Sequence, residues 1–227
     1  MSQIILNIDT ALEQAIISLS DGSNILDFIS NNEQKSHASI LHPAIKGLLK
    51  KHNLNPNQLD AISVIVGPGS YTGLRVGMAA AKGLCYALKI PMIAISTLEL
   101  MARNAVIAED FKDIRYCPMI DARRMEVYTA LYDVKLDELI SPTSVILDDH
   151  VYAEELEKGK IIFFGNGSKK FEMVQKHSAA IYRSYEILPQ TMGLMSLEKF
   201  NKKEFSNLWS DQPLYIKDFF TIKSPSK

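Results

Sequence analysis

The sequence predicts an α/β fold, because apolar runs of strand length alternate with longer segments of helical periodicity through most of the chain. Residues 60–66 (DAISVIV) become continuously apolar toward their end, as expected for a strand that is covered on both faces. A glycine-rich turn at 67–73 follows that strand and leads into a long helix. These features are typical of a sheet flanked by helices.

Three short strands are expected at the start of the chain, at 3–9, 14–20 and 25–30. Residues 21–24 (DGSN) form a turn of the kind that joins hairpin strands, so an antiparallel meander is predicted. A helix should follow from a cap at Ser36 to about residue 51, because its apolar residues form two adjacent rows that each repeat every four residues.

The same alternation continues to the end of the chain. The pattern predicts, in order, a helix from the glycine turn to about residue 89, a strand at 91–95, a helix at 98–108, strands at 116–121 and 126–133, a helix at 149–158, a strand at 160–165 and a helix near 192–203. We expect an N-terminal subdomain at 1–105 and a smaller C-terminal subdomain at 106–227, with the last helix, within 190–210, returning to the first subdomain.

Charge and composition exclude several classes of protein. The chain has 25 Lys and Arg against 26 Asp and Glu, so it lacks the basic excess of a protein that grips tRNA by itself. Its two cysteines, Cys85 and Cys117, lie far apart in apolar surroundings, which favours buried thiols in a reducing compartment. Neither a signal peptide nor a membrane span is apparent, so a cytoplasmic protein is expected.

The glycine turn at 67–73 (GPGSYTG) differs from known phosphate loops. It lacks the Gly-Lys-Ser/Thr ending of a P-loop, and Thr72 stands where a dinucleotide fingerprint needs its third glycine. A strand-to-helix turn of this kind does expose backbone N–H groups that suit an anion. Alternatively, Gly67 and Gly69 only permit a sharp turn. The turn at 165–168 (GNGS) is open to the same two interpretations.

The helix after the glycine turn is rich in small residues. Gly73, Gly77 and Ala80 lie on one broad side, and each glycine inside a helix costs about 1 kcal/mol relative to alanine. Its polar strip is narrow, so the helix should be covered from more than one direction. Either the chain's own loops and strands cover it, or it forms a subunit interface together with the helix at 36–51.

Five segments resemble one family in order along the chain. Residues 66–77 (VGPGSYTGLRVG) resemble the glycine signature of the TsaB (YeaZ) family. The other matching segments are 8–10 (IDT), 95–98 (ISTL), 119–128 (MIDARRMEVY) and 213–217 (PLYIK). The likeness runs from about residue 4 to 217. The long glycine motif followed by the Asp-Ala-Arg segment is specific.

The resemblance implies an actin/Hsp70/sugar-kinase-like fold with two subdomains of mixed sheets flanked by helices. It implies a non-catalytic partner of TsaD, the subunit that transfers threonylcarbamoyl to N6 of the tRNA adenosine at position 37. TsaE, an ATPase, would be a third component, the chain alone would form a homodimer, and tRNA would be contacted only indirectly.

The resemblance also implies that the first two long helices form the partner interface. The residues expected there are Ile40, Leu41, Ala44, Ile45, Leu48, Gly73, Leu74, Gly77, Met78, Ala80, Ala81 and Leu84. A vestigial phosphate-binding set is expected at Asp9, Thr10, Gly67, Gly69 and Ser70. No catalytic residue and no cofactor are expected, and nucleotide binding is left open.

No metal site is expected either. TsaD holds its metal with a His-x-x-x-His pair, and Thr97 and Met101 stand at the matching positions here. A neutral hydroxyl and a soft thioether are poor ligands for a divalent ion of that kind. His37 and His42 are five residues apart and would point about 140° apart on a helix, so we interpret them as solvated or interface histidines.

Two alternatives stay open. An actin-like ATPase or kinase, or a metalloprotease-like enzyme, would rest on Asp9 and the glycine turn. Arg123-Arg124 adds one cation beyond the family's usual Asp-Ala-Arg, which indicates either a solvated turn or a contact with tRNA phosphates.

Overall fold

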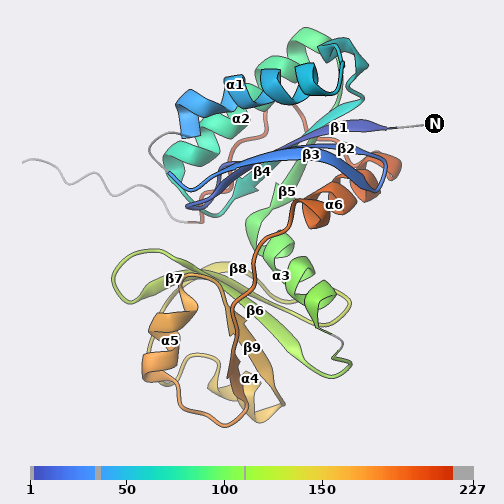
Figure 1. Cartoon of the computed structure of the whole chain (residues 1–227). Helices are drawn as coiled ribbons and strands as arrows, with labels where there is room; N and C mark the ends of the chain where they lie inside the picture. Colours follow the sequence, from blue (N-terminus) through green and yellow to red (C-terminus); the bar gives the residue numbers. More distant parts are fainter. Residues whose placement is uncertain (1–2, 34–36, 110, 217–227) are drawn as a thin grey trace, which may run out of the picture.

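A computed structural model describes residues 3–33, 37–109 and 111–216. Its first half contains a five-stranded mixed sheet with the order β3-β2-β1-β4-β5 (Figure 1). Strands β1 to β3 form the predicted antiparallel meander, and β4 and β5 run parallel to β1. The strands are β1 (Ile4–Asp9), β2 (Ala15–Asp21), β3 (Asn24–Asn31), β4 (Ala61–Gly67) and β5 (Met92–Ser96).

The second half repeats this wiring. Its sheet has the order β10-β9-β6-β7-β8, in which β6 to β8 are antiparallel and β9 and β10 run parallel to β6. The strands are β6 (Arg115–Asp121), β7 (Glu126–Tyr132), β8 (Glu138–Ile146), β9 (Ile161–Phe164) and β10 (Ala180–Tyr182).

The helices occupy equivalent places in the two halves. Each half has one helix after its third strand, one after its fourth and one after its fifth. These are α1 (His37–Lys51), α2 (Tyr71–Leu88) and α3 (Thr97–Ala108), then α4 (Ala153–Glu157), α5 (Ser168–Val174) and α6 (Pro189–Asn201), with a short 3₁₀ helix η2 (Pro56–Gln58) before β4. This duplicated, mixed-sheet architecture confirms the predicted actin/Hsp70/sugar-kinase-like fold.

Three layers build each lobe. Helices α1 and α2 pack on one face of the first sheet, and α6 packs on the other (Figure 1). Helices α4 and α5 lie on one face of the second sheet, and the opposite face is covered by α3. Since α3 also contacts β4 and β5, it lies between the lobes. Each half therefore contributes its last helix to the junction between the two sheets.

The strand sequences follow from this layering. Ile62 and Val64 on β4 belong to the core under α1 and α2, whereas Ala61 and Ile65 belong to the core on the opposite face. A strand that is covered on both faces needs apolar side chains at successive positions. The apolar run predicted at 60–66 is therefore the interior strand between β1 and β5 of the first sheet.

Several sequence predictions need correction. The last helix, predicted near 192–203, begins at Pro189 and ends at Asn201, and Ser206 beyond it forms a backbone bridge with Met92. Strands β8 and β10 and helix α5 were not predicted. The residues of strand β8 (ELISPTSVI) are exposed or half-buried, and apolar and polar residues do not alternate along it. The strand also pairs irregularly with β7. The predicted cap at Ser36 and motif residue Lys217 lie outside the described residues.

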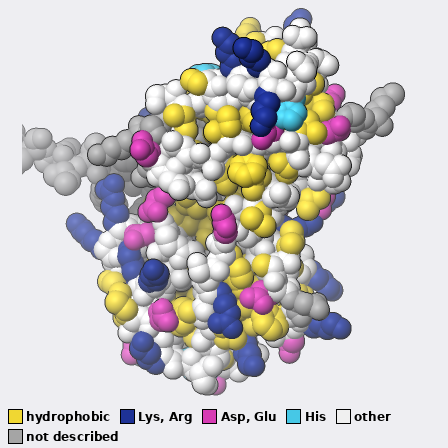
Figure 2. All heavy atoms as spheres, viewed as in Figure 1, with side chains coloured by type: hydrophobic (Ala, Val, Ile, Leu, Met, Phe, Trp, Pro, Cys, Tyr) yellow, Lys and Arg dark blue, Asp and Glu magenta, His cyan; other side chains and the backbone are white. Residues whose placement is uncertain are grey.

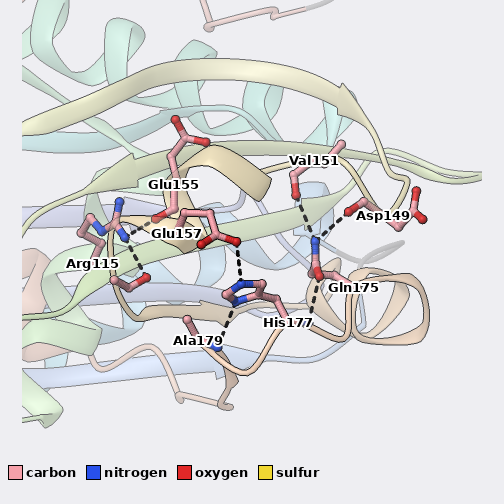
Figure 3. Close-up of polar contacts among 9 residues, drawn as sticks. Arg115, Asp149, Val151, Glu155, Glu157, Gln175, His177 and Ala179 are labelled. Atoms are coloured by element: carbon pink, nitrogen blue, oxygen red, sulfur yellow. Dashed lines mark hydrogen bonds and ion pairs between the residues drawn. The ribbon is translucent and has the colours of Figure 1, made fainter.

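Polar side chains fix the irregular part of the second lobe (Figure 3). Arg115 on β6 donates hydrogen bonds to the carbonyl oxygens of Glu155 and, at 2.8 Å, Gly159, where α4 ends. Gln175 donates to the carbonyl oxygen of Asp149 at 2.9 Å. A charged donor at the last carbonyls of a helix stabilises its C-terminus. These contacts hold the ends of the short helices in place.

Candidate functional site

The glycine turn packs against the chain's own backbone. A Cβ atom at Gly69 would lie 2.3 Å from the carbonyl oxygen of Ala11, and the amide of Ser70 donates a hydrogen bond of 2.7 Å to that same oxygen. The Ser70 hydroxyl caps α2 by accepting a hydrogen bond from the amide of Gly73 at 3.3 Å. Close backbone approach, rather than a bound anion, thus explains Gly69.

Thr10 explains the next two glycines. A Cβ at Gly73 would lie 1.9 Å from the carbonyl oxygen of Thr10, and one at Gly77 would lie 2.5 Å from its hydroxyl. The Thr10 hydroxyl donates a hydrogen bond of 2.7 Å to the Gly73 carbonyl oxygen. The same Gly77 position faces Ile8 and Val64 of the sheet, each at 3.5 Å. The small-residue side of α2 therefore faces the chain's own sheet.

Most residues of the predicted partner interface are buried within the chain itself. Among its residues, only Ile40 and Leu84 are partly exposed. The others are buried in the core of the chain itself: Leu41, Ala44, Ile45, Leu48, Gly73, Leu74, Gly77, Met78, Ala80 and Ala81. A helical wheel shows which residues share a face but not which face meets the sheet, and both apolar rows of α1 are turned inward.

The outer faces of α1 and α2 are not covered by any part of the chain within residues 3–33, 37–109 and 111–216. The two helices contact each other on the same face of the first sheet (Figure 1). A Cβ added at Gly47 of α1 or at Gly83 of α2 would meet nothing within 4 Å. Pro43 on α1 and Ala79 on α2 are also exposed. We name this surface the outer α1–α2 face.

This face is also cationic. Neither helix contains an Asp or Glu, whereas Lys46, Lys50 and Arg75 are exposed on them. Figure 2 shows Lys and Arg side chains gathered at the top of the upper lobe, over this layer. A surface of one sign favours a partner of opposite sign and disfavours a second copy of itself.

A C-terminal strap, residues 206–215, runs alongside α2. Lys82 donates a hydrogen bond of 2.5 Å to the carbonyl oxygen of Asp211, midway along the helix. The ring of Trp209 packs edge-on against Tyr86 with centroids 5.7 Å apart, and Tyr215 lies 5.3 Å from the ring of Tyr71 at the other end of the helix. The strap therefore borders α2 along its length, and it presents Trp209 with 81% of its surface exposed.

A cavity of about 190 Å³ lies between the lobes. Asp9 at the end of β1 lines it together with Asn104, Met101, Asn166 and Tyr185. Burial raises the pKa of Asp9 from 3.8 to about 6, although its Oδ1 accepts a hydrogen bond from the amide of Ala11 at 3.0 Å. Ligand pockets are typically larger, at roughly 300–1,000 Å³, so this cavity is smaller than a typical ligand pocket.

Asp121 occupies the place in the second lobe that Asp9 has in the first, because both end the first strand of their sheets. Its carboxylate accepts a hydrogen bond of 2.6 Å from Lys170. Partial burial opposes ionisation of Asp121, but the hydrogen bonds from Lys170 and the Arg123 amide outweigh it and lower its pKa. One aspartate is thus buried beside a cavity, and the other is exposed and paired with a lysine.

The structure separates the predicted phosphate-binding set. Asp9 lines the cavity, whereas Thr10, Gly69 and Ser70 make the internal contacts described above. A Cβ at Gly67, whose φ is +118°, would lie 2.9 Å from the carbonyl oxygen of Leu214 in the C-terminal strap. Four of the five residues, Thr10, Gly67, Gly69 and Ser70, therefore pack against other parts of the chain itself.

The residues at the TsaD metal positions do not fit a metal site. Thr97 is buried and its hydroxyl has no hydrogen-bond partner among the described residues, and Met101 supplies only a thioether. Within residues 3–33, 37–109 and 111–216, no group of three or more His, Cys, Asp or Glu side chains could hold a metal ion. His42 is exposed, but the prediction of a solvated or interface histidine is wrong for His37, which is buried with Nε2 3.1 Å from the carbonyl oxygen of Glu13.

Sequence reasoning missed two features of this region. The C-terminal strap has no periodicity, so its course along α2 was not predictable. Gly83 lies at the edge of the narrow polar strip of α2, next to Lys82 in sequence, and that strip was the available signal for the outer face. In the described ranges, no helix is long and apolar enough to cross a membrane.

Comparison with known proteins decides the family. A family model described as "TsaD: tRNA N6-adenosine threonylcarbamoyltransferase" matches residues 24–195. A TsaB protein of Bacillus subtilis (strain 168) is 34% identical over 165 residues, which cover 71% of this chain and 70% of the relative. The chain belongs to the TsaB family. Curated members of the family carry the description "tRNA threonylcarbamoyladenosine biosynthesis protein TsaB".

Two further TsaB relatives span nearly the whole chain. The TsaB protein of Escherichia coli (strain K12) is 27% identical over 222 residues and aligns with 94% of each sequence. The solved structure of YeaZ from Pseudomonas aeruginosa has 22% identity and a TM-score of 0.77, and the match covers 94% of this chain and 99% of that one. The latter likeness supports the shared fold, and the TsaB family match therefore holds across both lobes.

Proposed function

We propose that this chain is a non-catalytic accessory subunit that binds a TsaD-type catalytic subunit and supports threonylcarbamoyl transfer to tRNA. The family membership supports a role in making this tRNA modification. The match to a TsaD family model supports a partner of the same architecture, because related folds can pair through equivalent surfaces. The environments of Thr97 and Met101 support the absence of chemistry in this subunit.

One observation carries the proposed interface. Gly47 and Gly83 lie inside helices, and a Cβ at either position would meet none of the described residues within 4 Å, although each glycine costs about 1 kcal/mol relative to alanine. Pro43 adds a further break in helix propensity on the same face. These residues weaken their helices, and no internal contact of the described chain requires them. Their presence is explained if the backbone of a partner helix approaches closely there. The outer α1–α2 face thus replaces the inner face that the sequence suggested.

The charge of this face defines the partner. Lys46, Lys50 and Arg75 would meet a partner surface that carries acidic side chains. A homodimer would bring the same cations together, so we propose that self-association through this face is weaker than pairing with a TsaD-type subunit. Added salt should accordingly weaken the heterodimer, while it should leave self-association unchanged or strengthen it.

A substitution at the centre of the face tests the interface. Gly83→Leu would place a bulky side chain where close approach is proposed, and Ala108→Leu makes a comparable change on an exposed position of α3. We expect Gly83→Leu to weaken binding to the TsaD-type subunit at least about tenfold, and Ala108→Leu to leave it within a factor of two. Size-exclusion chromatography and calorimetric titration measure both. Equal affinities for the two variants would reject this interface.

Reconstitution tests the function itself. The catalytic subunit, a TsaE-type ATPase and unmodified tRNA are incubated with and without this chain, and modified adenosine is measured by mass spectrometry. We expect product only when the chain is present. Product formation without it, or threonylcarbamoyl transfer by the chain alone, would overturn the proposed role.

A further inference from the structure

The turn between β6 and β7 contains two adjacent arginines in an unfavourable backbone conformation. Arg123 has a φ of 70° and Arg124 a φ of 49°, so both lie in the left-handed region. Glycine and asparagine adopt that region more readily than residues with long side chains. The conformation of the turn therefore does not explain why arginines stand at these two positions.

Hydrogen bonds hold this turn in place. The carboxylate of Asp121 accepts hydrogen bonds of 2.6 Å from the amide of Arg123 and from the ammonium of Lys170. The amide of Asp121 donates a hydrogen bond of 2.8 Å to the side-chain oxygen of Asn166, which follows β9. The base of the turn is thus tied to both α5 and the loop before it.

The two guanidinium groups differ from the other arginines of the described ranges. Arg103 pairs with Glu198, Arg115 donates to carbonyl oxygens, Arg183 lies 4.0 Å from Glu109, and Arg75 lies over the ring of Tyr71. The side chains of Arg123 and Arg124 are exposed and have no ion pair or hydrogen bond within the same ranges. Only these two guanidinium groups are presented to solvent without a partner in the described structure.

We propose that Arg123 and Arg124 contact the phosphate backbone of tRNA. The proposal rests on the function proposed above and differs from the expectation that this subunit reaches tRNA only indirectly. Guanidinium groups form paired hydrogen bonds with phosphate oxygens, and a turn that is already rigid loses little freedom on binding. Lys169 on α5 is exposed and directly precedes Lys170, which anchors the turn, so it adds a third cation to this region.

The location of the turn fits RNA better than a nucleotide. Figure 2 shows Lys and Arg side chains projecting from the left edge of the lower lobe, at the end of the sheet where Figure 1 draws the β6–β7 turn. The nearby cavity of about 190 Å³ is smaller than a typical ligand pocket. A net charge of −1 for the whole chain agrees with a local contact that assists RNA binding by the complex without supporting it alone.

A double substitution that suits the backbone tests the proposal. Arg123→Asn/Arg124→Gly removes both charges and places residues that tolerate a positive φ, so the fold should be retained. The matched control is Lys202→Asn/Lys203→Gly at the end of α6, where both lysines are exposed and Lys203 has a φ of 58°. Both variants change the net charge equally, which separates a local contact from general electrostatics.

The readout is the affinity of the assembled complex for unmodified tRNA, measured by fluorescence anisotropy across a salt series. We expect the arginine variant to bind about tenfold more weakly at 0.1 M salt and to show a salt slope smaller by about 2, about 1 for each lost phosphate contact. The lysine control should match the wild type. Arg123→Gln/Arg124→Gln repeats the measurement with side chains of similar length and should give the same loss.

The outcomes separate this inference from the proposed function. An unchanged affinity and salt slope in both arginine variants would overturn the tRNA contact, even if the complex assembles and needs this chain. Equal losses in the arginine and lysine variants would also overturn it, in favour of a general charge effect. Arginine-dependent binding of ATP to the isolated chain, with unchanged tRNA affinity, would assign the pair to a nucleotide instead. Failure of the wild-type chain to assemble would count against the proposed function first.

Discussion

A single buried carboxyl group distinguishes the first lobe from the second. Asp9 is 2% exposed, and burial raises its pKa to about 6, whereas a lysine and a backbone amide keep its counterpart Asp121 ionised. The folded chain holds the Asp9 proton more tightly than the unfolded chain does. Ionisation of Asp9 must therefore destabilise the fold as the pH rises from about 4 through about 6.

Replacement of this carboxyl group should stabilise the protein at neutral pH. Asp9→Asn keeps an oxygen that can accept the hydrogen bond from the Ala11 amide, and the new side chain cannot ionise. The rise in pKa corresponds to ~3 kcal/mol at most, so the variant should be up to that much more stable above pH 7 and equal to the wild type near pH 4. Urea unfolding at pH 4.5 and pH 7.5 measures this. A stability difference that is the same at both pH values would contradict it.

At the scale of the element, α2 contains glycines of two kinds. Gly77 faces the Thr10 hydroxyl and the sheet, and Gly83 faces open space. The sequence alone correctly predicts that this helix is unusual, because its glycines and alanines exceed what helix propensity favours. It could not assign the two sides, because that depends on where the loop after β1 crosses the helix. That loop is distant in sequence and has no periodic pattern.

Alanine at each of these positions should have opposite effects on stability. Gly77→Ala places a Cβ 2.5 Å from the Thr10 hydroxyl, which is itself held by Gly73, so we expect a loss of about 2 kcal/mol. Gly83→Ala adds a methyl group in open space and should stabilise the isolated chain by about 0.5–1 kcal/mol through helix propensity. Thermal and urea unfolding measure both. A loss of stability at Gly83 would mean that something in the chain covers that face.

The predictability of other elements follows the same division. Strands β1 and β4 were predicted because burial on both faces leaves an apolar run that a short window detects. Strand β8 was missed because Pro142 and several half-buried polar residues interrupt its pattern, and only pairing with β7 defines it. The burial of most predicted interface residues was missed for a related reason, since it depends on which contacts the chain itself satisfies.

At the scale of the whole molecule, the lobes share their helices. Buried Leu98 and Met101 of α3 pack with the second sheet, whereas Met192 and Met195 of α6 pack with the first. Asn104 on α3 links the two helices, because its amide donates to the carbonyl oxygen of Glu186 and its oxygen accepts from the Thr191 hydroxyl at 2.8 Å. If either sheet unfolds, the helix that the other half contributes to it therefore exposes its apolar side chains to water.

This exchange predicts that the two lobes unfold together. Cys85 lies in the core of the first lobe and Cys117 in that of the second, and burial raises the pKa of each thiol to about 12, so both should resist alkylation in the folded chain. Pulse labelling with N-ethylmaleimide at increasing urea, followed by peptide mass spectrometry, reports each lobe separately. We expect one common midpoint.

Asn104→Ala should lower that midpoint for both cysteines by an amount corresponding to about 2–3 kcal/mol, because it leaves buried polar groups without partners. Labelling of Cys117 at clearly lower urea than Cys85 would show that the second lobe opens independently, and the shared helices would then not couple the lobes.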